Sequence, residues 1–416
     1  MLEEPDDAFD IFQQLLSAGA DPNIAKTYWG ETPFIYAIQR ADAESVALLI
    51  EAGADVNQSV RPGATTPLQR SFDRDDLTVA RMLIDAGADV HQPGLFHDAV
   101  WGRIPGAVEF LLFAGADPTI STANGMTGLH ALGVGDDLSG LEALLAAGVD
   151  INAKDSNGRT PVFSALRHAD AAIVHRMIIA GADLNVVDDY GRTPLHGAIS
   201  NRYLSVENIS LAVAAGADLN ARDSRDQTPL HRAVKRASPE GLNQLVEAGA
   251  DLEALDGDGA TPLLVALKEG RVENARTLIE LGADVEVKGF AGRGPLFYAA
   301  SSENPEMMAL VLGATTLVDV RDDNAVTPLM LAAATGPPEL IRVLIDAGAN
   351  VAAKDAFGST PLHYAARFAD GPIVRTLIRR GADPNVLDSE GRSPAILGYN
   401  NRKLRADPVA FDMLSE

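Results

Sequence analysis

Histidine is the residue type of this chain best suited to acid–base or metal chemistry, and the 416-residue sequence contains eight. Five share one slot of a recurring motif, where an imidazole would brace a turn by hydrogen bonds: His97, His130, His196, His231 and His363. His91, His168 and His175 occupy unrelated positions, which a set of metal ligands would not. The histidine pattern therefore predicts structural roles and no metal site.

The remaining candidate chemistry has little support. There is no cysteine, which excludes thiolate catalysis, disulfides and Cys-based zinc sites but says nothing of the compartment. The glycine-rich runs at 133–135 and 257–259 lack the Gly-Lys-Ser/Thr ending of a phosphate-binding loop. Carboxylates are abundant, but acid–base hydrolysis needs an enclosed cleft with one acid in an apolar pocket. We predict no enzyme activity and no cofactor.

Two short motifs recur along almost the whole chain. Gly-Ala-Asp or a near variant begins at Gly19, Gly53, Gly87, Gly115, Gly148, Gly181, Gly216, Gly249, Gly282, Gly313, Gly348 and Gly381. Thr-Pro-Leu-His or a near variant begins at Thr32, Thr66, Thr127, Thr160, Thr193, Thr228, Thr261, Gly294, Thr327, Thr360 and Ser393. From Thr228 to Ser393 the second motif returns every 33 residues. A fixed period of this length indicates a stack of repeats.

Each repeat reads as two short helices and a projecting loop. Threonine caps a helix N-terminus, and the proline after it fits the first helical turn. Apolar residues follow at helical spacing, as in Leu362, Ala365 and Ala366, and residues 373–378 suit a second helix that stops at Gly381. The polar stretch 383–391 suits an extended segment with a tight turn. One such pair cannot bury its apolar face alone, so the pairs must stack.

This pattern resembles the ankyrin-repeat family over nearly the whole chain, with about eleven to twelve repeats. The resemblance implies an all-α fold, a curved solenoid whose loop tips and first helices line a concave, protein-binding face. We expect one solenoid over 1–416: a half-repeat cap at 1–18, repeats over 19–392 and a C-terminal cap at 393–416. The N-terminal cap should bury its apolar residues, which are Phe9, Ile11, Phe12, Leu15 and Leu16.

The third repeat, 87–115, departs most from the pattern because it is shortened between His91 and Gly94. One projecting loop should be absent there, which would make this repeat a hinge. Leu95-Phe96-His97 replaces Pro-Leu-His, and Trp101 takes the slot that Arg367 has later. Trp101 either binds a partner or plugs the gap. An unfamiliar enzyme site remains an alternative here, and its residues would be His97, Asp98, Trp101 and Arg103.

Aromatic and basic residues recur at positions that the resemblance places on the concave face. Aromatic residues at or near the loop tips are Tyr28, Trp29, Tyr190, Phe290 and Phe357. Basic residues at the inward ends of first helices are Arg40, Arg74, Arg167, Lys235, Arg236, Lys268 and Arg367, while Arg159, Arg192, Arg293 and Arg392 flank the loops. With Trp101, the tip aromatics and inward cations form the predicted partner-binding set. In the alternative interpretation, Trp29 packs on the cap and the cations are solvated side chains that support helices.

Charge and hydropathy restrict the partner. There are 34 Lys and Arg against 58 Asp and Glu, a formal charge of −24, which argues against nucleic acid and anionic membranes. The N-terminus is acidic, and no apolar run reaches membrane-spanning length. We expect no membrane insertion, a monomer, and a cytoplasmic protein as given, with signal-independent secretion left open. A basic stripe would select a protein partner with an acidic or mixed-charge surface.

These patterns lead to a functional hypothesis: a non-catalytic scaffold that sequesters, inhibits or tethers a protein partner. The Ala-rich repeats resemble bacterial ankyrin proteins, which include secreted effectors and proteins that neutralise toxins. Such an effector or adaptor, acting on a host protein, is one alternative. A spacer that self-associates through its ends is another.

Overall fold

The computed structural model describes residues 12–24, 32–40, 42–58, 65–72, 76–133, 138–199, 205–236 and 238–414. Within these ranges the regular structure is helical, in pieces of three to ten residues, without a β-strand. Contacts group the chain into two units, which are described separately. Unit 1 is Met1–Ala198 with Glu207–Asp218, and unit 2 is Ile199–Val206 with Leu219–Glu416.

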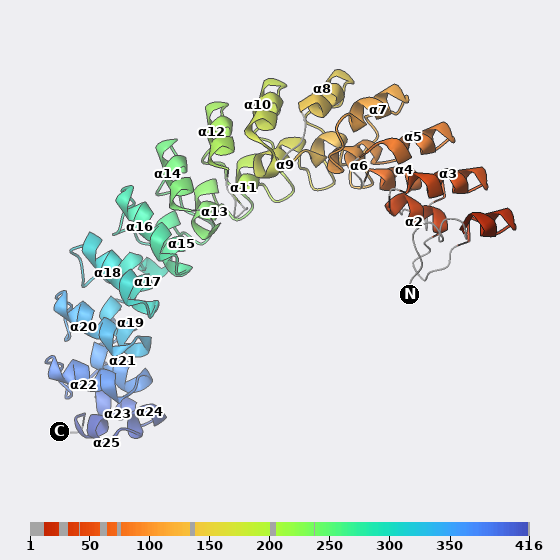
Figure 1. Ribbon diagram of the computed structural model, residues 1–416. Helices are drawn as coiled ribbons and strands as arrows, with labels where there is room; N and C mark the ends of the chain where they lie inside the picture. The colour runs from red at the N-terminus through yellow and green to blue at the C-terminus, as the bar shows by residue number, and fades with distance from the viewer. Residues whose placement is uncertain are drawn as a thin grey trace. The chain divides into compact units, whose positions relative to one another are not determined.

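Unit 1 contains two rows of helices (Figure 1). The first helices of its repeats are α2 (Pro33–Gln39), α4 (Pro67–Ser71), α6 (Leu95–Trp101), the 3₁₀ helix η1 (Gly128–Ala131), α9 (Pro161–His168) and α11 (Pro194–Ala198). The second helices are α3 (Ala43–Glu51), α5 (Thr78–Asp85), α7 (Ala107–Phe113), α8 (Leu138–Ala146), α10 (Ala171–Ile179) and α12 (Val206–Ala214). Each first helix packs on the next first helix, as α9 does on α11.

Unit 2 repeats the arrangement. Its first helices are α13 (Pro229–Arg236), α15 (Pro262–Lys268), α17 (Pro295–Ser301), α19 (Pro328–Thr335), α21 (Pro361–Phe368) and α23 (Pro394–Gly398). The second helices are α14 (Pro239–Glu247), α16 (Val272–Glu280), α18 (Pro305–Ala314), α20 (Pro338–Asp346) and α22 (Gly371–Arg379), and α24 (Arg402–Arg405) and α25 (Pro408–Asp412) follow at the end. A short 3₁₀ helix, η2 (Phe290–Gly292), lies in one loop. α19 packs on α21, and α21 on α23.

Helices this short depend on caps and packing rather than on intrinsic propensity. Thr261 begins α15 by accepting the Leu264 N–H, with Pro262 in the first turn. In α21 the side chains of Leu362, Ala365 and Ala366 are fully buried. Alanine at the contact lets neighbouring helices approach closely.

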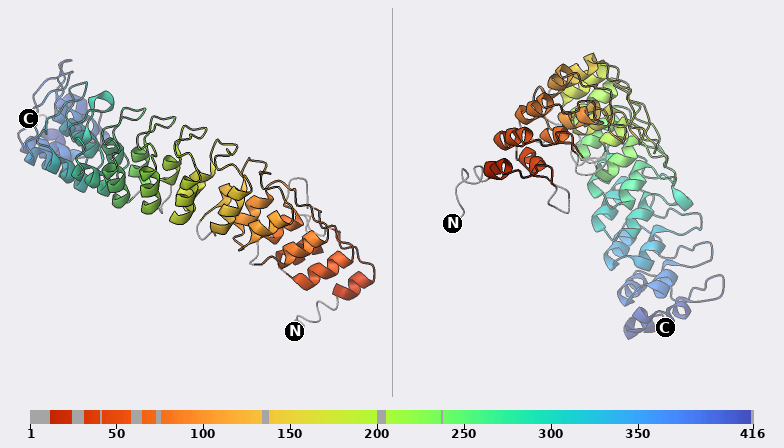
Figure 2. Two further views of the ribbon diagram at one scale, coloured as in Figure 1. Left: turned by 90° about the horizontal axis from the view of Figure 1, so that it is seen from above. Right: turned by 90° about the vertical axis from the view of Figure 1, so that its right-hand side faces the viewer.

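A loop that we call a finger connects each second helix to the next first helix, and an aspartate fixes its tip. The Oδ1 atom of Asp388 accepts the backbone N–H groups of Glu390 and Arg392, each at 2.9 Å. The same two bonds recur at Asp155, Asp188, Asp223, Asp256, Asp322 and Asp355. Neighbouring fingers are also joined, because Ser389 N–H donates to the Phe357 carbonyl at 2.9 Å. Figure 2 shows the fingers of unit 2 projecting to one side of its helices.

An asparagine ladder links the ends of successive second helices. The Oδ1 atom of Asn152 accepts the Asp183 N–H at 2.8 Å, and its Nδ2 donates to the Gly181 carbonyl at 3.0 Å. Asn23, Asn57 and Asn185 make the same pair of bonds. Each rung satisfies an exposed backbone donor and acceptor of the next repeat.

The third repeat lacks a finger, as its length predicts. α5 ends at Asp85 and α6 begins at Leu95, and Gln92 fills the space by contacting the Thr66 hydroxyl. Gly94 has a φ of +80°, and a Cβ there would lie 2.8 Å from the Thr122 methyl group. Trp101 is 69% exposed. The interpretation of Trp101 as a plug is therefore wrong, because Gln92 and the close approach at Gly94 already close the gap.

The N-terminal cap differs from the prediction in one respect. Residues 12–17 are helical, but Leu15 is 55% exposed rather than inside. Phe9 and Ile11 lie outside the described residues. At the other end, Leu404, Ala410 and Leu414 are buried and cover the last repeat.

Candidate functional site

The structure distributes the proposed partner-binding residues over both units rather than gathering them into one site. Tyr28, Trp29 and Arg74 lie outside the described residues. Unit 1 carries Arg40, Trp101, Arg167 and Tyr190, and unit 2 carries Lys235, Arg236, Lys268, Phe290, Phe357 and Arg367. Of these, Phe357 and Arg367 line a common groove. We call the surface formed by the finger tips and first helices of each unit the finger face.

Most cations of the finger face have carboxylate partners. Lys235 Nζ lies 3.3 Å from Glu269, and Lys268 Nζ lies 3.8 Å from Asp258. Arg293 and Arg232 lie 3.1 Å and 3.2 Å from the buried carboxylates of Asp322 and Asp223. Ion pairs within the scaffold thus offset the positive charge at these positions, and the basic stripe stays a prediction for the remaining cations.

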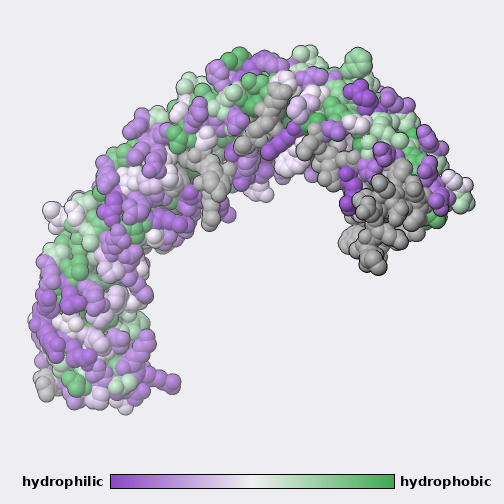
Figure 3. All heavy atoms as spheres, viewed as in Figure 1, coloured by the Kyte–Doolittle hydropathy of each residue, from purple (hydrophilic) through white to green (hydrophobic). Residues whose placement is uncertain are grey.

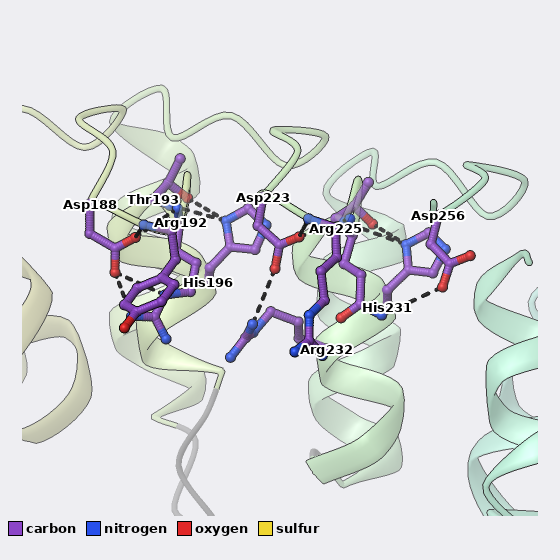
Figure 4. A network of polar contacts seen from close by, with 12 residues as sticks. Asp188, Arg192, Thr193, His196, Asp223, Arg225, His231, Arg232 and Asp256 are labelled. Atoms are coloured by element: carbon purple, nitrogen blue, oxygen red, sulfur yellow. Dashed lines mark hydrogen bonds and ion pairs between the residues drawn. The ribbon is translucent and has the colours of Figure 1, made fainter. Parts of the chain in front are cut away.

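The arginines that flank the fingers hold the finger aspartates. In unit 1 Arg192 lies 2.6 Å from the Asp188 carboxylate (Figure 4). Arg159 lies 3.7 Å from the same carboxylate. Burial would raise the pKa of Asp188, but hydrogen bonds from Arg192 and from the Tyr190 N–H outweigh it and lower that pKa. Arg392 acts in the same way on Asp388, and the pKa of Asp388 is also lowered. These arginines therefore stabilise the fingers that carry the candidate contact residues.

The motif histidines brace the repeats, as their shared slot predicts. In unit 2 the Nδ1 atom of His231 accepts the Thr228 N–H at 3.2 Å, and Nε2 lies 3.0 Å from the Ala260 carbonyl of the next repeat (Figure 4). Nδ1 is the acceptor, so Nε2 carries the proton. His130 and His363 form the same bridge. Burial lowers the pKa of all three, which keeps them neutral.

His97 does not follow this pattern, so its predicted bracing role is wrong. Gly94 stands where threonine caps the other helices, and α6 has no side-chain cap. The His97 ring instead stacks on Trp101, with centroids 6.4 Å apart, and its Nδ1 lies 3.5 Å from Asp98. A cavity of about 80 Å³ beside Arg103 is lined by neither His97, Asp98 nor Trp101. The four residues of the alternative enzyme site do not share an enclosed pocket there.

A recess on the finger face lies in unit 2, between the repeats that begin with α21 and α23. It is a groove of about 400 Å³, and its lining residues are Asp355, Phe357, Ser359, His363, Tyr364, Arg367, Phe368, Glu390, Arg392 and Leu397. Two consecutive fingers and two first helices supply them. Figure 3 shows hydrophilic side chains over most of the visible surface of unit 2, with apolar residues in small groups between them. Apolar and charged side chains meet in this groove.

Tyr364 is held within the groove by the finger of its own repeat. Its hydroxyl donates to Oδ2 of Asp355 at 2.8 Å, while Oδ1 of Asp355 accepts the Phe357 and Ser359 N–H groups. Burial raises the pKa of Tyr364, and the neighbouring carboxylate adds to the effect. Tyr364 thus lines the groove with a neutral aromatic ring whose orientation is fixed by the bond to Asp355.

Aromatic residues elsewhere on the finger face are exposed and sit beside cations. Arg192 lies 4.7 Å from the ring centroid of Tyr190, and Arg40 lies 5.5 Å from that of Tyr36. Arg40 also donates to the Tyr36 hydroxyl at 3.1 Å. Phe290, at the start of η2, is 77% exposed. These pairs hold aromatic surface in fixed positions.

Two further findings on the described residues concern metal binding and membrane spanning. No three His, Asp or Glu side chains among them gather in a way that could hold a metal ion. No helix in the described part of the chain is long and apolar enough to cross a membrane.

The helix pairs begin with Thr-Pro caps, stack on one another and are joined by fingers. This architecture defines a class of repeat protein, and sequence comparison identifies the family. The family model for ankyrin repeats in three copies matches residues 4–93, 129–223, 164–256, 205–289, 239–322 and 296–388. The chain belongs to the ankyrin-repeat family, and its fold is an all-α ankyrin solenoid. The unmatched residues 94–128 contain much of the shortened third repeat. Ankyrin repeats are generally scaffolds for protein interaction and are typically non-catalytic.

Many solved structures are similar to this chain. The crystal structure of the human ASB11 ankyrin repeat domain is similar, with 25% identity, a TM-score of 0.47, and coverage of 54% of this chain and 98% of that domain. No curated protein sequence matches.

Sequence reasoning missed part of the groove. Tyr364, Phe368 and Leu397 line it together with the predicted Phe357 and Arg367. A signal existed, because the position after the motif histidine carries a large residue at Tyr36, Tyr298, Tyr364 and Leu397. Tyr364 and Leu397 at that position line the groove, whereas the predicted residues lie at helix ends and finger tips.

Proposed function

We propose that this protein is a non-catalytic scaffold that binds one protein partner through its finger face and thereby sequesters, inhibits or tethers it. The observation that carries the proposal is the display of exposed aromatic side chains on fixed finger backbones. Phe357, at a tip, is 61% exposed while its own N–H and carbonyl are both hydrogen-bonded. Aromatic side chains with few rotatable bonds on a preorganised backbone are frequent binding hot spots.

The partner's surface follows from the distribution of charge on the finger face. Most cations are neutralised by finger carboxylates, whereas aromatic residues and a few cations remain available. A partner of mixed charge with apolar anchors fits this surface better than a uniformly acidic one.

Site-specific photo-crosslinking tests where the partner binds. A photoreactive phenylalanine analogue replaces Tyr190 or Phe357 on the finger face, and Phe113 in a matched control. Phe113 is 95% exposed at the end of a second helix, α7. In extract of the organism that makes the protein, we expect one polypeptide to be captured from Tyr190 or Phe357 and displaced by excess parent protein, with none captured from Phe113. Equal capture from Phe113 would contradict the proposal.

The role is tested on the captured partner. Titration of its activity with the purified protein separates sequestration or inhibition from tethering. Inhibition that is complete at equimolar protein indicates sequestration or inhibition, whereas unchanged activity within a stable complex indicates tethering.

A further inference from the structure

The groove of unit 2 contains a cation that lacks a carboxylate partner. Arg367 lies at the end of α21, and its guanidinium carbon is 5.0 Å from the centroid of the Phe368 ring. It makes no ion pair within the described part of the chain. Lys235 and Lys268 occupy the same slot in earlier repeats, and both are paired with carboxylates. Arg367 therefore differs from Lys235 and Lys268 in having no carboxylate partner.

The other charges of the groove are already engaged. Asp355 accepts the Tyr364 hydroxyl and two backbone N–H groups. Arg392 pairs with Asp388 at 2.9 Å and with Glu390 at 2.6 Å. A ligand that enters the groove thus meets Arg367 as the cation whose hydrogen bonds are still to be made.

The geometry of Arg367 suits a carboxylate. A guanidinium that stacks on an aromatic ring uses its flat face, and its N–H groups stay free at the edge of the plane for two parallel hydrogen bonds. Beside it, Phe357, Tyr364, Phe368 and Leu397 supply an apolar lining. At about 400 Å³ the groove is near the small end of ligand pockets, so it has room for a few side chains rather than a folded surface.

We propose that this groove binds an extended segment of the partner protein in which a carboxylate side chain stands next to an aromatic or branched aliphatic residue. The carboxylate bonds to Arg367, and the apolar side chain packs among Phe357, Tyr364 and Phe368. This inference rests on the proposed scaffold function and names the chemistry of the segment that it recognises. Screening at physiological salt limits the repulsion from the distant acidic residues of the chain.

Short synthetic peptides provide the probe. Fluorescein-labelled peptides of sequence Gly-Ser-X-Z-Ser-Gly, with X as Glu, Gln or Lys and Z as Phe, Leu or Ser, are titrated with the full chain and followed by fluorescence anisotropy. We expect the Glu-Phe and Glu-Leu peptides to bind most tightly. Replacing Glu by Gln should weaken binding about tenfold, because a charge-assisted pair is lost. Replacing the apolar residue by Ser should weaken it further.

Three variants assign the effect to the groove. Arg367→Gln should abolish the preference for Glu over Gln and retain the preference for Phe over Ser, and Phe368→Ala should weaken every peptide. Lys268→Gln, in the same slot of another repeat, is the matched control and should change nothing. All three residues are at least half exposed or at a helix end, and circular dichroism confirms folding.

Two results would overturn the inference: a preference for Glu that survives Arg367→Gln, or no saturable binding by any peptide. The scaffold proposal is judged separately by crosslinking from Tyr190 and Phe357. Capture there with no peptide binding rejects the groove assignment and leaves the scaffold role standing.

Discussion

The slot that His231 occupies is filled by other residues elsewhere in the chain, and each shows what the slot requires. Gln69 accepts the Thr66 N–H at 3.0 Å and donates to the Pro93 carbonyl at 3.1 Å, which reproduces both bonds of His231. Phe163 can make neither bond, and the buried hydroxyl of Thr160 is left without a partner. The bridge between two repeats therefore needs one acceptor and one donor in this slot and no ionisable chemistry, whereas Phe163 and Leu264 fill the slot without making it.

This comparison gives a prediction for single substitutions at His231. His231→Ala should lower the free energy of unfolding by about 1–3 kcal/mol, because it strands a buried N–H at Thr228 and a carbonyl at Ala260. His231→Gln should cost less than about 1 kcal/mol, since Gln69 makes both bonds. Urea unfolding followed by far-UV circular dichroism measures both. Equal losses for the two variants would show that the bridge contributes nothing.

The buried histidines also predict how stability changes with pH. Burial lowers the pKa of His130, His231 and His363, so the unfolded chain binds more protons once the pH falls below about 6.5. Stability should therefore fall between about pH 7 and about pH 5.5. The lowered pKa values of Asp188 and Asp388 act in the same direction at more acidic pH, because their stabilisation is lost as those carboxylates are protonated.

A variant pair isolates the histidine contribution. The urea midpoint of unfolding should fall less between about pH 7 and about pH 5.5 in His231→Gln than in the parent protein. In His175→Gln, at an exposed position of α10, the fall should be the same as in the parent. A pH dependence that is identical in both variants would contradict the assignment to the buried ring.

Among the elements, the third repeat lacks several devices that fix its neighbours. It has no finger, and His91 replaces the ladder asparagine. The N-cap residues of α6 and α7 are Gly94 and Gly106, which provide no side-chain cap. Each absence removes hydrogen bonds that join one repeat to the next. Local opening is then less costly here than in a complete repeat.

Restoring one rung of the ladder should strengthen this repeat. In His91→Asn the new side chain can accept the Asp117 N–H and donate to the Gly115 carbonyl, as Asn57 and Asn152 do with their neighbours. We expect a gain of about 0.5–1.5 kcal/mol in the free energy of unfolding. Asn152→Ala is the reciprocal control and should lose a similar amount. A destabilised His91→Asn variant would mean that the ends of these two repeats are not in register.

Hydrogen exchange tests the hinge prediction directly. Amide protons of α6 should exchange faster than those of α15. The N-terminus of α15 is capped by the Thr261 side chain, and this helix follows a complete finger. Exchange is measured by mass spectrometry on peptides from the two helices. Similar protection of both would reject the hinge.

Much of each element could be predicted from the sequence, because Thr-Pro starts and glycine stops encode helix boundaries locally. The role of Arg192 could not, since its partner Asp188 lies within a finger whose geometry the motif does not specify. Likewise, Tyr364 and Leu397 come from adjacent repeats and meet only after stacking. Local signals locate helices, whereas a groove depends on the distance between them.

At the scale of the whole molecule, charge is the dominant property. Acidic residues exceed basic ones by 24, and many basic residues are already paired. Repulsion among the unpaired carboxylates should therefore limit stability at low ionic strength. We expect the urea midpoint to rise when sodium chloride is increased from about 20 mM to about 150 mM, where the screening length shortens to about 8 Å. A falling midpoint would mean that ion pairs outweigh the repulsion.

The bonding of the finger tips has an evolutionary consequence. At Asn157, Asn324 and Phe357 the backbone carries the bonds to the aspartate and to the neighbouring finger, and the scaffold makes no demand on the identity of the side chain. Mutation at such a position can be accepted without a compensating change elsewhere. Each of these finger tips thus offers a position whose side chain can vary independently. Substitutions there can change what the surface recognises one residue at a time, while the architecture is inherited unchanged.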